Sequence, residues 1–216
     1  MKMNRLSIVL SMALAAMTLS ACVTTMSREQ CLATDWQAVG FQDGARGYGS
    51  GRLAVHRKNC AEARVAPDLA AYNAGHREGI RNYCRPKQAY RAAIRGEAYR
   101  GVCPSRMEPG FLYAYEAGKR IHAFNAAIRR LSGRMNGAER DLRTAEAHIP
   151  ELESRATSNK LKRRQRRRAV MELQHLSEEI GALRLRISRL AVKRANLRGK
   201  LSVIRPQYDR EFGLRY

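Results

Sequence analysis

Two long stretches in the second half of the chain carry apolar residues at alternating spacings of three and four. This pattern repeats every seven residues and is typical of a helix that buries one stripe against another helix. The first stripe consists of Ile128, Leu131, Met135, Ala138, Leu142, Ala145, Ile149, Leu152 and Ala156. The second consists of Ala169, Leu173, Leu176, Ile180, Leu183, Ile187, Leu190, Arg194, Leu197, Leu201 and Ile204. The pattern predicts two long helices.

The two stripes do not share one heptad frame, and residues 157–160 between them (Thr-Ser-Asn-Lys) are poor helix formers. We therefore predict an antiparallel, coiled-coil-like hairpin over residues 109–204, with arms 109–156 and 161–204 of similar length and a C-terminal tail over 205–216. At 1.5 Å per residue the longer arm spans ~72 Å. Pro150 is expected to bend the first arm near its end. Pairing of the arms between chains, which would give a homo-oligomer, is an alternative.

The first half of the chain has a different composition, rich in cysteine and glycine. It predicts a small disulfide-stapled, glycine-rich head over residues 22–108, and the whole chain is expected to be mainly α-helical. Asp68, which follows a proline, is a good N-cap and predicts a helix over 69–83. Gly40 and Gly44, like Gly75 and Gly79, lie four residues apart, a spacing that lets another backbone approach a helix closely.

The N-terminus reads as a secretory signal. Lys2 and Arg5 precede an uncharged apolar run of about fourteen residues, which is shorter than the ~20 that a membrane-spanning helix needs. Leu19-Ser20-Ala21-Cys22 then resembles the bacterial lipobox. The resemblance implies a signal peptide over residues 1–21 and acylation of Cys22 by fatty acids such as palmitate, and two or more acyl chains hold a protein stably on a bilayer. Val23, where aspartate would favour retention at the inner membrane, suggests the periplasmic face of the outer membrane.

Four cysteines remain in the mature chain: Cys31, Cys60, Cys84 and Cys103. An even number in an oxidising compartment predicts two disulfides. We favour sequential pairing, Cys31 with Cys60 and Cys84 with Cys103. In the loop-entropy model each of these disulfides stabilises the fold by roughly 3 kcal/mol. A metal site is the alternative, because His56, Cys60 and His76 lie near one another in sequence. The cysteine spacings of 29, 24 and 19 residues are not those of a zinc site, and we expect no metal.

The charge balance is strongly basic. Without the first 21 residues the chain has 41 − 2 = 39 basic and 19 acidic residues, a net charge of +20. In a cytoplasmic protein such a balance would indicate binding to nucleic acid. For a secreted protein we expect no nucleic acid, and the available polyanions are phospholipid head groups, lipopolysaccharide, the cell wall or acidic proteins.

The charge is concentrated in the second arm, where residues 160–204 carry +11 while residues 109–156 carry +2. Seven cations lie at its start: Lys160, Lys162, Arg163, Arg164, Arg166, Arg167 and Arg168. Cations near a helix N-terminus oppose the helix dipole. We therefore predict that this cluster contacts an anionic surface or an acidic partner rather than forming an ordinary solvated helix end.

No pattern of catalytic residues is apparent. The five histidines lie in unrelated contexts, and no hydrolase, metalloprotease or nucleotide-binding motif is present. The sequence therefore predicts no catalytic residue and no cofactor.

The cysteine-rich half nevertheless resembles a known family. The motifs that carry the resemblance are Met26-Ser27-x3-Cys31-x3-Asp35-Trp36-x3-Gly40-x2-Asp43-Gly44-x2-Gly47, His56-x3-Cys60, Pro67-Asp68-x3-Tyr72-x2-Gly75-x3-Gly79-x3-Tyr83-Cys84, Tyr99-x-Gly101-Val102-Cys103-Pro104 and Glu108-Pro109-x-Phe111. Together they resemble the domain of unknown function 2799 family of proteobacterial envelope lipoproteins, over roughly residues 26 to 125. The resemblance implies an envelope lipoprotein and supplies no activity.

The sequence thus favours a membrane-anchored envelope lipoprotein of structural or interaction type, which is not an enzyme. A periplasmic chaperone that holds unfolded envelope proteins along its helical arms is the alternative. A cell-envelope enzyme comes third.

Overall fold

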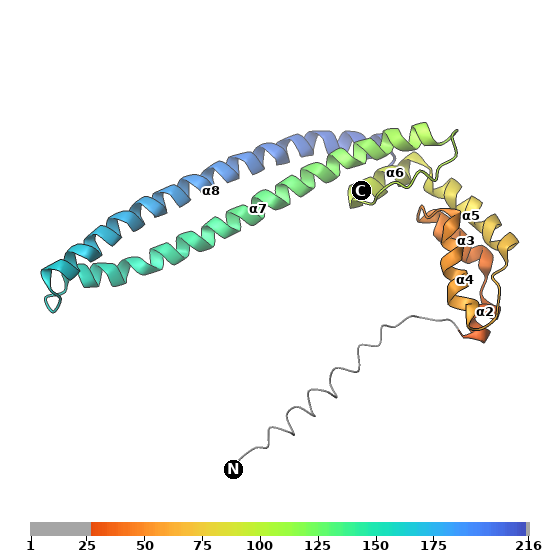
Figure 1. Ribbon diagram of the computed structural model, residues 1–216. Coiled ribbons are helices and arrows are strands. Elements are labelled where there is room, and N and C mark those ends of the chain that lie inside the picture. The colour runs from red at the N-terminus through yellow and green to blue at the C-terminus, as the bar shows by residue number, and fades with distance from the viewer. Residues whose placement is uncertain (1–26, 215–216) are drawn as a thin grey trace, which may run out of the picture. The chain divides into compact units, whose positions relative to one another are not determined.

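The computed structural model describes residues 27–214, so the predicted signal peptide and Cys22 lie outside the described residues. The elements are α2 (Arg28–Ala33), α3 (Trp36–Ala45), a 3-10 helix η1 (Ser50–Arg52), α4 (Leu53–Ala61), α5 (Leu69–Tyr83), α6 (Pro86–Arg95), α7 (Glu108–Thr157) and α8 (Arg163–Glu211) (Figure 1). No residue between 27 and 214 is in a β-strand. The predicted mainly α-helical class is confirmed.

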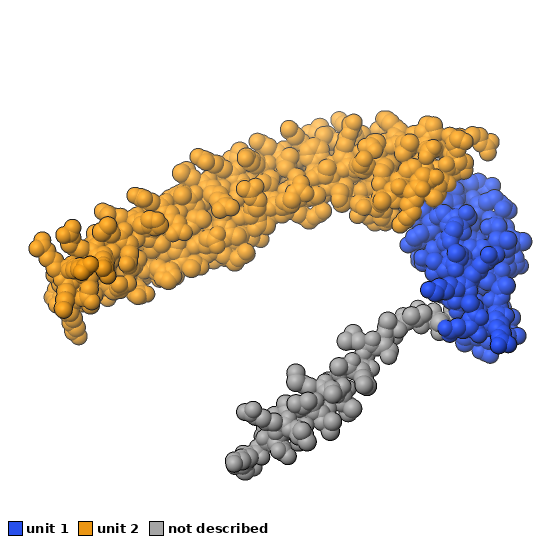
Figure 2. All heavy atoms as spheres, viewed as in Figure 1, with its two compact units in different colours: residues 1–82 blue, residues 83–216 orange. Residues whose placement is uncertain are grey.

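The chain divides into two compact units, residues 1–82 and 83–216 (Figure 2). The composition of the sequence instead suggested a boundary after residue 108. The structure differs because α6 packs against α7, and because the disulfide between Cys84 and Cys103 lies within the second unit. The change of composition near Pro109 therefore marks the start of α7 rather than a boundary between units.

Helices α3 and α5 of the first unit begin at side-chain caps. The carboxylate of Asp35 accepts a hydrogen bond from the backbone of Ala38 at 3.0 Å, and that of Asp68 accepts one from Ala71 at 2.9 Å. Each bond satisfies one of the amides that a helix start leaves without a partner. The helix predicted over 69–83 is confirmed with these bounds.

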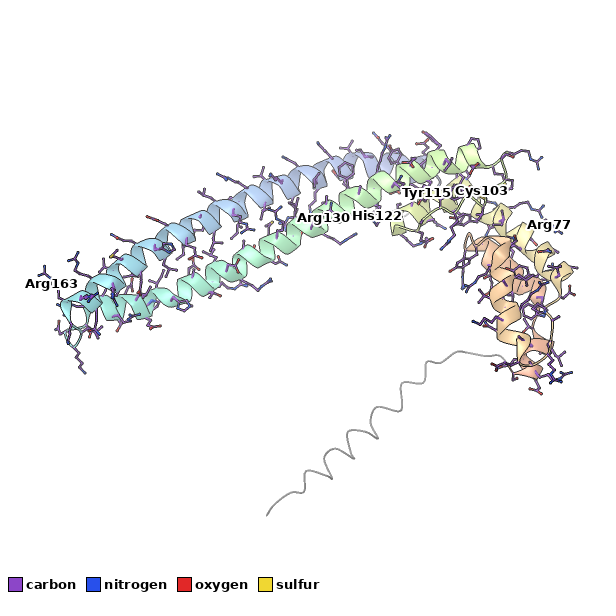
Figure 3. The ribbon with its side chains drawn as sticks, in the orientation of Figure 1. Arg77, Cys103, Tyr115, His122, Arg130 and Arg163 are labelled. Atoms are coloured by element: carbon purple, nitrogen blue, oxygen red, sulfur yellow. A yellow bond between two sulfur atoms is a disulfide. The ribbon has the colours of Figure 1, made fainter. Side chains whose placement is uncertain are left out.

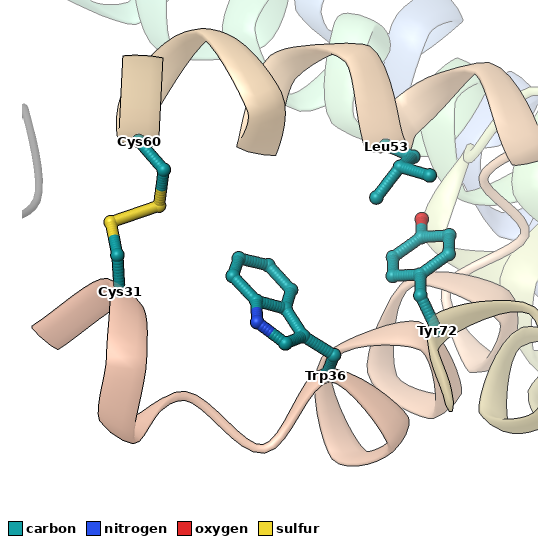
Figure 4. Packing of buried hydrophobic residues seen from close by; sticks show 5 residues of the cluster. All are labelled: Cys31, Trp36, Leu53, Cys60 and Tyr72. Atoms are coloured by element: carbon teal, nitrogen blue, oxygen red, sulfur yellow. A yellow bond between two sulfur atoms is a disulfide. The ribbon is translucent and has the colours of Figure 1, made fainter. Parts of the chain in front are cut away.

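The core of the first unit is small and is built around one disulfide (Figure 4). Cys31 of α2 is bonded to Cys60 of α4, with 6.0 Å between their Cα atoms. Trp36, Leu53 and Tyr72 are buried in the same cluster. Together with Cys84–Cys103 this disulfide follows the predicted sequential pairing among the described residues.

Helices α3 and α5 touch through their backbones. A Cβ atom added to Gly40 would overlap the carbonyl of Tyr72, and one added to Gly75 would overlap the carbonyl of Gln37. Gly44 and Gly79 show the same close approach one helical turn further along. The close backbone approach predicted from the glycine spacing is confirmed, and no larger residue fits between these two helices.

In the second unit, α6 packs against the start of α7. It buries Ala89, Tyr90, Ala92 and Ala93 on one side, and it ends at Gly96 in a left-handed conformation with φ of 82°. The rings of Tyr99 and Phe111, whose centroids are 4.6 Å apart, lie near the second disulfide in the chain and help to fix the segment before α7.

Helices α7 and α8 lie side by side and are joined by residues 158–162 (Figure 1). Contacts join the start of α7 to the end of α8, where the hydroxyl of Tyr113 donates to Glu211 at 2.7 Å. Others join the end of α7 to the start of α8, where Arg155 lies 3.6 Å from Glu172. Every residue of both predicted stripes is buried or half-buried. The stripes therefore form the interior of this helix pair.

Both long helices extend beyond their predicted ends. Helix α7 continues through Pro150 to Thr157, and α8 continues through Pro206 to Glu211, although the sequence placed a tail from residue 205. For α8 the reason is its contact with α6. The hydroxyl of Tyr90 donates to the buried carboxylate of Asp209 at 2.9 Å, and the rings of Tyr90 and Phe212 lie 5.0 Å apart. These contacts hold the last turns of α8 as helix.

Replacing Gly75 with alanine should destabilise the first unit by ~1–3 kcal/mol, because the added methyl group has no space against α3. The single tryptophan, Trp36, lies in that unit's core and reports unfolding in urea through its fluorescence. A Cβ atom at Gly51 would meet nothing within 4 Å, so Gly51→Ala is the matched control. Its stability should be unchanged or up to ~1 kcal/mol higher. Equal stability of both variants would contradict the backbone contact.

Candidate functional site

The cations predicted to contact an anionic surface lie at the turn between α7 and α8 and in the first turns of α8. We call Lys160, Lys162, Arg163, Arg164, Arg166, Arg167 and Arg168 the basic cluster. Six of the seven are exposed and Arg166 is half-buried. The side chain of Arg163 points outward at this end of the helix pair (Figure 3). The structure thus brings the predicted residues together on one end of the second unit.

Arg166 differs from the other six in its contacts. Its Nη1 atom donates to the carbonyl of Leu161 at 2.6 Å and more weakly to that of Ser158 at 3.4 Å. The side chain therefore folds back and closes the turn that precedes α8. Arg166 belongs to the structure of the turn, which sequence reasoning missed because its partners are backbone groups.

Within residues 27–214, no acidic side chain forms an ion pair with the basic cluster. Along the same helices Arg184 pairs with Glu146 at 2.8 Å and Arg155 pairs with Glu172 at 3.6 Å. In the part of the chain that the structure describes, none of the ion pairs includes a residue between 160 and 168. The exposed cations repel one another and oppose the dipole of α8.

A shallow depression of about 510 Å³ lies between α7 and α8 near the basic cluster. It brings together two histidines that are unrelated in the sequence. Its lining residues are His148, Glu151, Leu152, Arg155, Glu172, His175 and Leu176. Within residues 27–214 no group of three or more histidines, cysteines or acids is arranged to hold a metal ion. The depression has acids as well as a cation in its wall, so it does not extend the basic cluster.

The first unit contains a buried polar cluster that sequence reasoning missed. Asp43 is only 6% exposed, and its Oδ2 atom accepts a hydrogen bond from the hydroxyl of Tyr72 at 2.9 Å. The Nε2 atom of His56 lies 2.7 Å from the same oxygen. One carboxylate thus joins α3, α4 and α5. Buried charges in proteins are normally paired in this way.

Aromatic rings surround the Asp43 carboxylate. Trp36 meets the ring of His56 edge-on, with centroids 6.0 Å apart, and the rings of Tyr72 and His76 are stacked at 5.8 Å. His76 donates from Nε2 to the carbonyl of Tyr48 at 2.7 Å. Burial, and then the hydrogen bond and negative charge of Asp43, raise the pKa of Tyr72 far above its ordinary value. The phenol therefore stays protonated and acts as a permanent donor.

This arrangement suits a structural role. The hydroxyl of Tyr72 and the carboxylate of Asp43 are buried and bonded to each other, which leaves neither group available to an external substrate. His56, which sequence reasoning weighed as a metal ligand beside Cys60, contacts Asp43 instead, and the sulfur of Cys60 is in a disulfide. The basic cluster, by contrast, presents six of its seven cations to the outside.

Residues 35–120 match the family described as a protein of unknown function, DUF2799. This segment is a DUF2799 domain. The family predicted from the motifs is thereby confirmed, over a slightly shorter range than the roughly 26 to 125 expected. The DUF2799 segment contains the Asp43 cluster and the second disulfide, and it ends within α7 before the basic cluster. No curated protein and no solved structure matches the chain.

The DUF2799 match does not bear on membrane attachment. The lipobox residues and Cys22 lie outside the described residues, and acylation of Cys22 stays a prediction. Among the helices of residues 27–214, none combines the length and the apolar character needed to cross a membrane.

Replacing Tyr72 with phenylalanine should lower stability near neutral pH by ~1–3 kcal/mol, because the buried carboxylate of Asp43 loses a donor. The pH dependence gives a second readout. An unfolded tyrosine ionises near pH 10, whereas folded Tyr72 has a raised pKa and does not. Its contribution is therefore fully present below about pH 10 and is lost as the pH rises further.

Urea unfolding followed by Trp36 fluorescence measures both effects. Between about pH 9 and 11 the stability of the parent should fall more steeply than that of Tyr72→Phe. Parallel curves for the two proteins would show that Tyr72 titrates normally in the folded chain.

Proposed function

We propose that this protein is an envelope lipoprotein of structural or interaction type that binds an anionic surface through the basic cluster. In this proposal acyl chains on Cys22 anchor it to the periplasmic face of the outer membrane. Residues 22–108, which take in the first unit and the part of the second unit that precedes α7, serve as a disulfide-stapled, glycine-rich head. Residues 109–204 serve as an antiparallel, coiled-coil-like hairpin whose tip carries the cations.

The single observation that carries the proposal is the basic cluster itself. Six exposed cations lie at or beside the start of α8, and those near its first turn oppose the helix dipole by roughly 0.3–1 kcal/mol each. None of the six is in an ion pair with an acid of the described residues. An anionic partner outside the chain would relieve this repulsion. Residues 109–156 of the facing helix carry only +2 against +11 for residues 160–204, which supports assigning the attraction to α8.

The helix pair supports such a role mechanically. Each helix has about fifty residues and hence a length of ~75 Å. The stripes in the interior hold the pair together without help from the basic cluster. Attraction between exposed charges fades over a Debye length of ~8 Å at physiological ionic strength, so binding should depend strongly on salt.

Neutralising four arginines of the basic cluster should strongly weaken binding to anionic surfaces. We would change Arg163, Arg164, Arg167 and Arg168 to glutamine and leave Arg166 in place, because it closes the turn. The processed protein would carry Cys22→Ser, so that no acyl chain contributes. Binding to phosphatidylglycerol vesicles and to cell-wall sacculi, measured by co-sedimentation at several salt concentrations, should fall at least tenfold at low salt.

The matched control removes four arginines from exposed positions on α7: Arg129, Arg130, Arg134 and Arg140. It lowers the net charge by the same amount and should bind nearly as the parent does. Helix content by circular dichroism should be equal in all three proteins. If both variants lose binding equally, or if binding does not respond to salt, the basic cluster is not the contact site.

Replacing Cys22 with alanine should abolish metabolic labelling of the protein by fatty acid, because the thiol is the predicted site of acylation. Val23→Asp provides the control. It keeps Cys22 and should remain labelled, but the sorting rule implied by the lipobox resemblance predicts that it fractionates with the inner membrane. Labelling that survives Cys22→Ala would contradict acylation at Cys22 and would not affect the proposed role of the basic cluster.

A further inference from the structure

Helix α8 exposes a row of large apolar side chains that the interior stripe does not explain. Met171 is 66% exposed, Leu185 60%, Val192 61% and Val203 61%. We call these four residues the outer row. Buried side chains of the same helix, such as Leu183 and Leu190, face α7 instead. The outer row is therefore a second apolar feature of α8.

The four residues lie on one face of the helix. Leu185 and Val192 are seven residues apart, Met171 precedes Leu185 by fourteen, and Val203 follows Val192 by eleven. Intervals of seven and eleven return to nearly the same side of an α-helix. From Met171 to Val203 the row extends for ~48 Å.

Three cations and one acid accompany the outer row on the same face, the acid being Glu178, seven residues after Met171. Arg168 lies three residues before Met171, Arg189 lies four after Leu185 and three before Val192, and Lys200 lies three before Val203. Residues three or four apart are neighbours on a helix surface. These cations are exposed, and the row continues directly from the basic cluster, of which Arg168 is a member.

Helix α7 lacks this feature, although it has the same length and the same kind of interior stripe. Its exposed large apolar residues are Leu112 and Tyr113, at its first turn, and none follows between residues 114 and 157. The two helices therefore differ in their outer faces and not in how they pack together. A general tolerance for surface apolar residues would have affected both.

We infer that this face of α8 lies on an anionic lipid bilayer, with the outer row inserted among the head groups and the flanking cations against lipid phosphates. This inference rests on the proposed function and names its anionic surface. Cations alone would suit any polyanion, but a glycan polymer offers no partner to Met171 or Leu185. Single apolar side chains spaced along a helix need no matching pockets in a bilayer, whereas a protein partner would have to supply them. Interfacial helices combine basic and apolar residues in this way.

The test changes the apolar side chains and leaves the charge alone. Met171, Leu185, Val192 and Val203 would become glutamine in the processed Cys22→Ser protein. The control changes four exposed apolar residues elsewhere, Leu32, Val55, Leu69 and Leu112, in the same way. We expect the outer-row variant to bind phosphatidylglycerol vesicles at least tenfold more weakly, most clearly at high salt, and the control to bind as the parent does.

A fluorescence measurement locates the helix directly. Leu185→Trp should shift to shorter wavelength and be quenched by brominated lipid when phosphatidylglycerol vesicles are added. Ala147→Trp, at an exposed position on α7, should do neither. Trp36 is buried in the first unit and contributes a constant background.

The outcomes separate this inference from the proposed function. Unchanged vesicle binding by the outer-row variant, or no quenching at position 185, overturns the bilayer contact while the basic cluster keeps its role. If the parent sediments as a dimer and the outer-row variant as a monomer with full vesicle binding, the face joins two copies of the chain and the inference is wrong. If the arginine variant binds vesicles normally and only the outer-row variant loses binding, the bilayer contact is supported and the proposed role of the basic cluster is contradicted.

Discussion

Burial of two narrow apolar stripes against each other is the interaction on which the second unit depends. A single helix of about fifty residues with one such stripe exposes it along its whole length and gains little stability alone. Packed together, α7 and α8 remove both stripes from water, and small residues such as Ala138 and Ala145 let the helices approach closely. The ion pairs between the helices and the contacts of α6 add to the stability that the packed stripes provide.

The first unit meets the same need differently, because it has few large apolar residues. Its stability comes from backbone contact at Gly40 and Gly75, from the disulfide of Cys31 and Cys60, and from the carboxylate of Asp43. A disulfide lowers the conformational entropy of the unfolded chain, and a buried carboxylate has to be hydrogen-bonded to its neighbours. Both features therefore compensate for a small core. These features all lie within, or are bonded to, the segment that matches the DUF2799 family.

The sequence predicted features whose signal is local and periodic. The stripes, the N-cap at Asp68 and the glycine spacings could be recognised because each depends on residues within a few turns of one another. Helix α3 could not, since it contains Gly40 and Gly44 and is held by contacts with α5. The bond between Tyr90 and Asp209, which spans 119 residues, likewise extends α8 beyond its predicted end. In the candidate site the cluster was visible as a run of cations, whereas the folding back of Arg166 depends on the turn.

The packing of α8 against α7 separates the residues that stabilise the helix pair from the residues on the outer face of α8. Because the packed stripes hold the two helices together, the outer face of α8 can carry residues that do not help folding. Met171, which is 66% exposed and lies beside Arg168, is one of them. Cations crowded at a helix start weaken that helix by repulsion and by opposing its dipole. An isolated helix would fray there, but Ala169 is fully buried against the partner helix at the same turn. The packing of α8 against α7 thus permits an accumulation of charge that the helix alone could not hold, and it keeps that charge at one defined place.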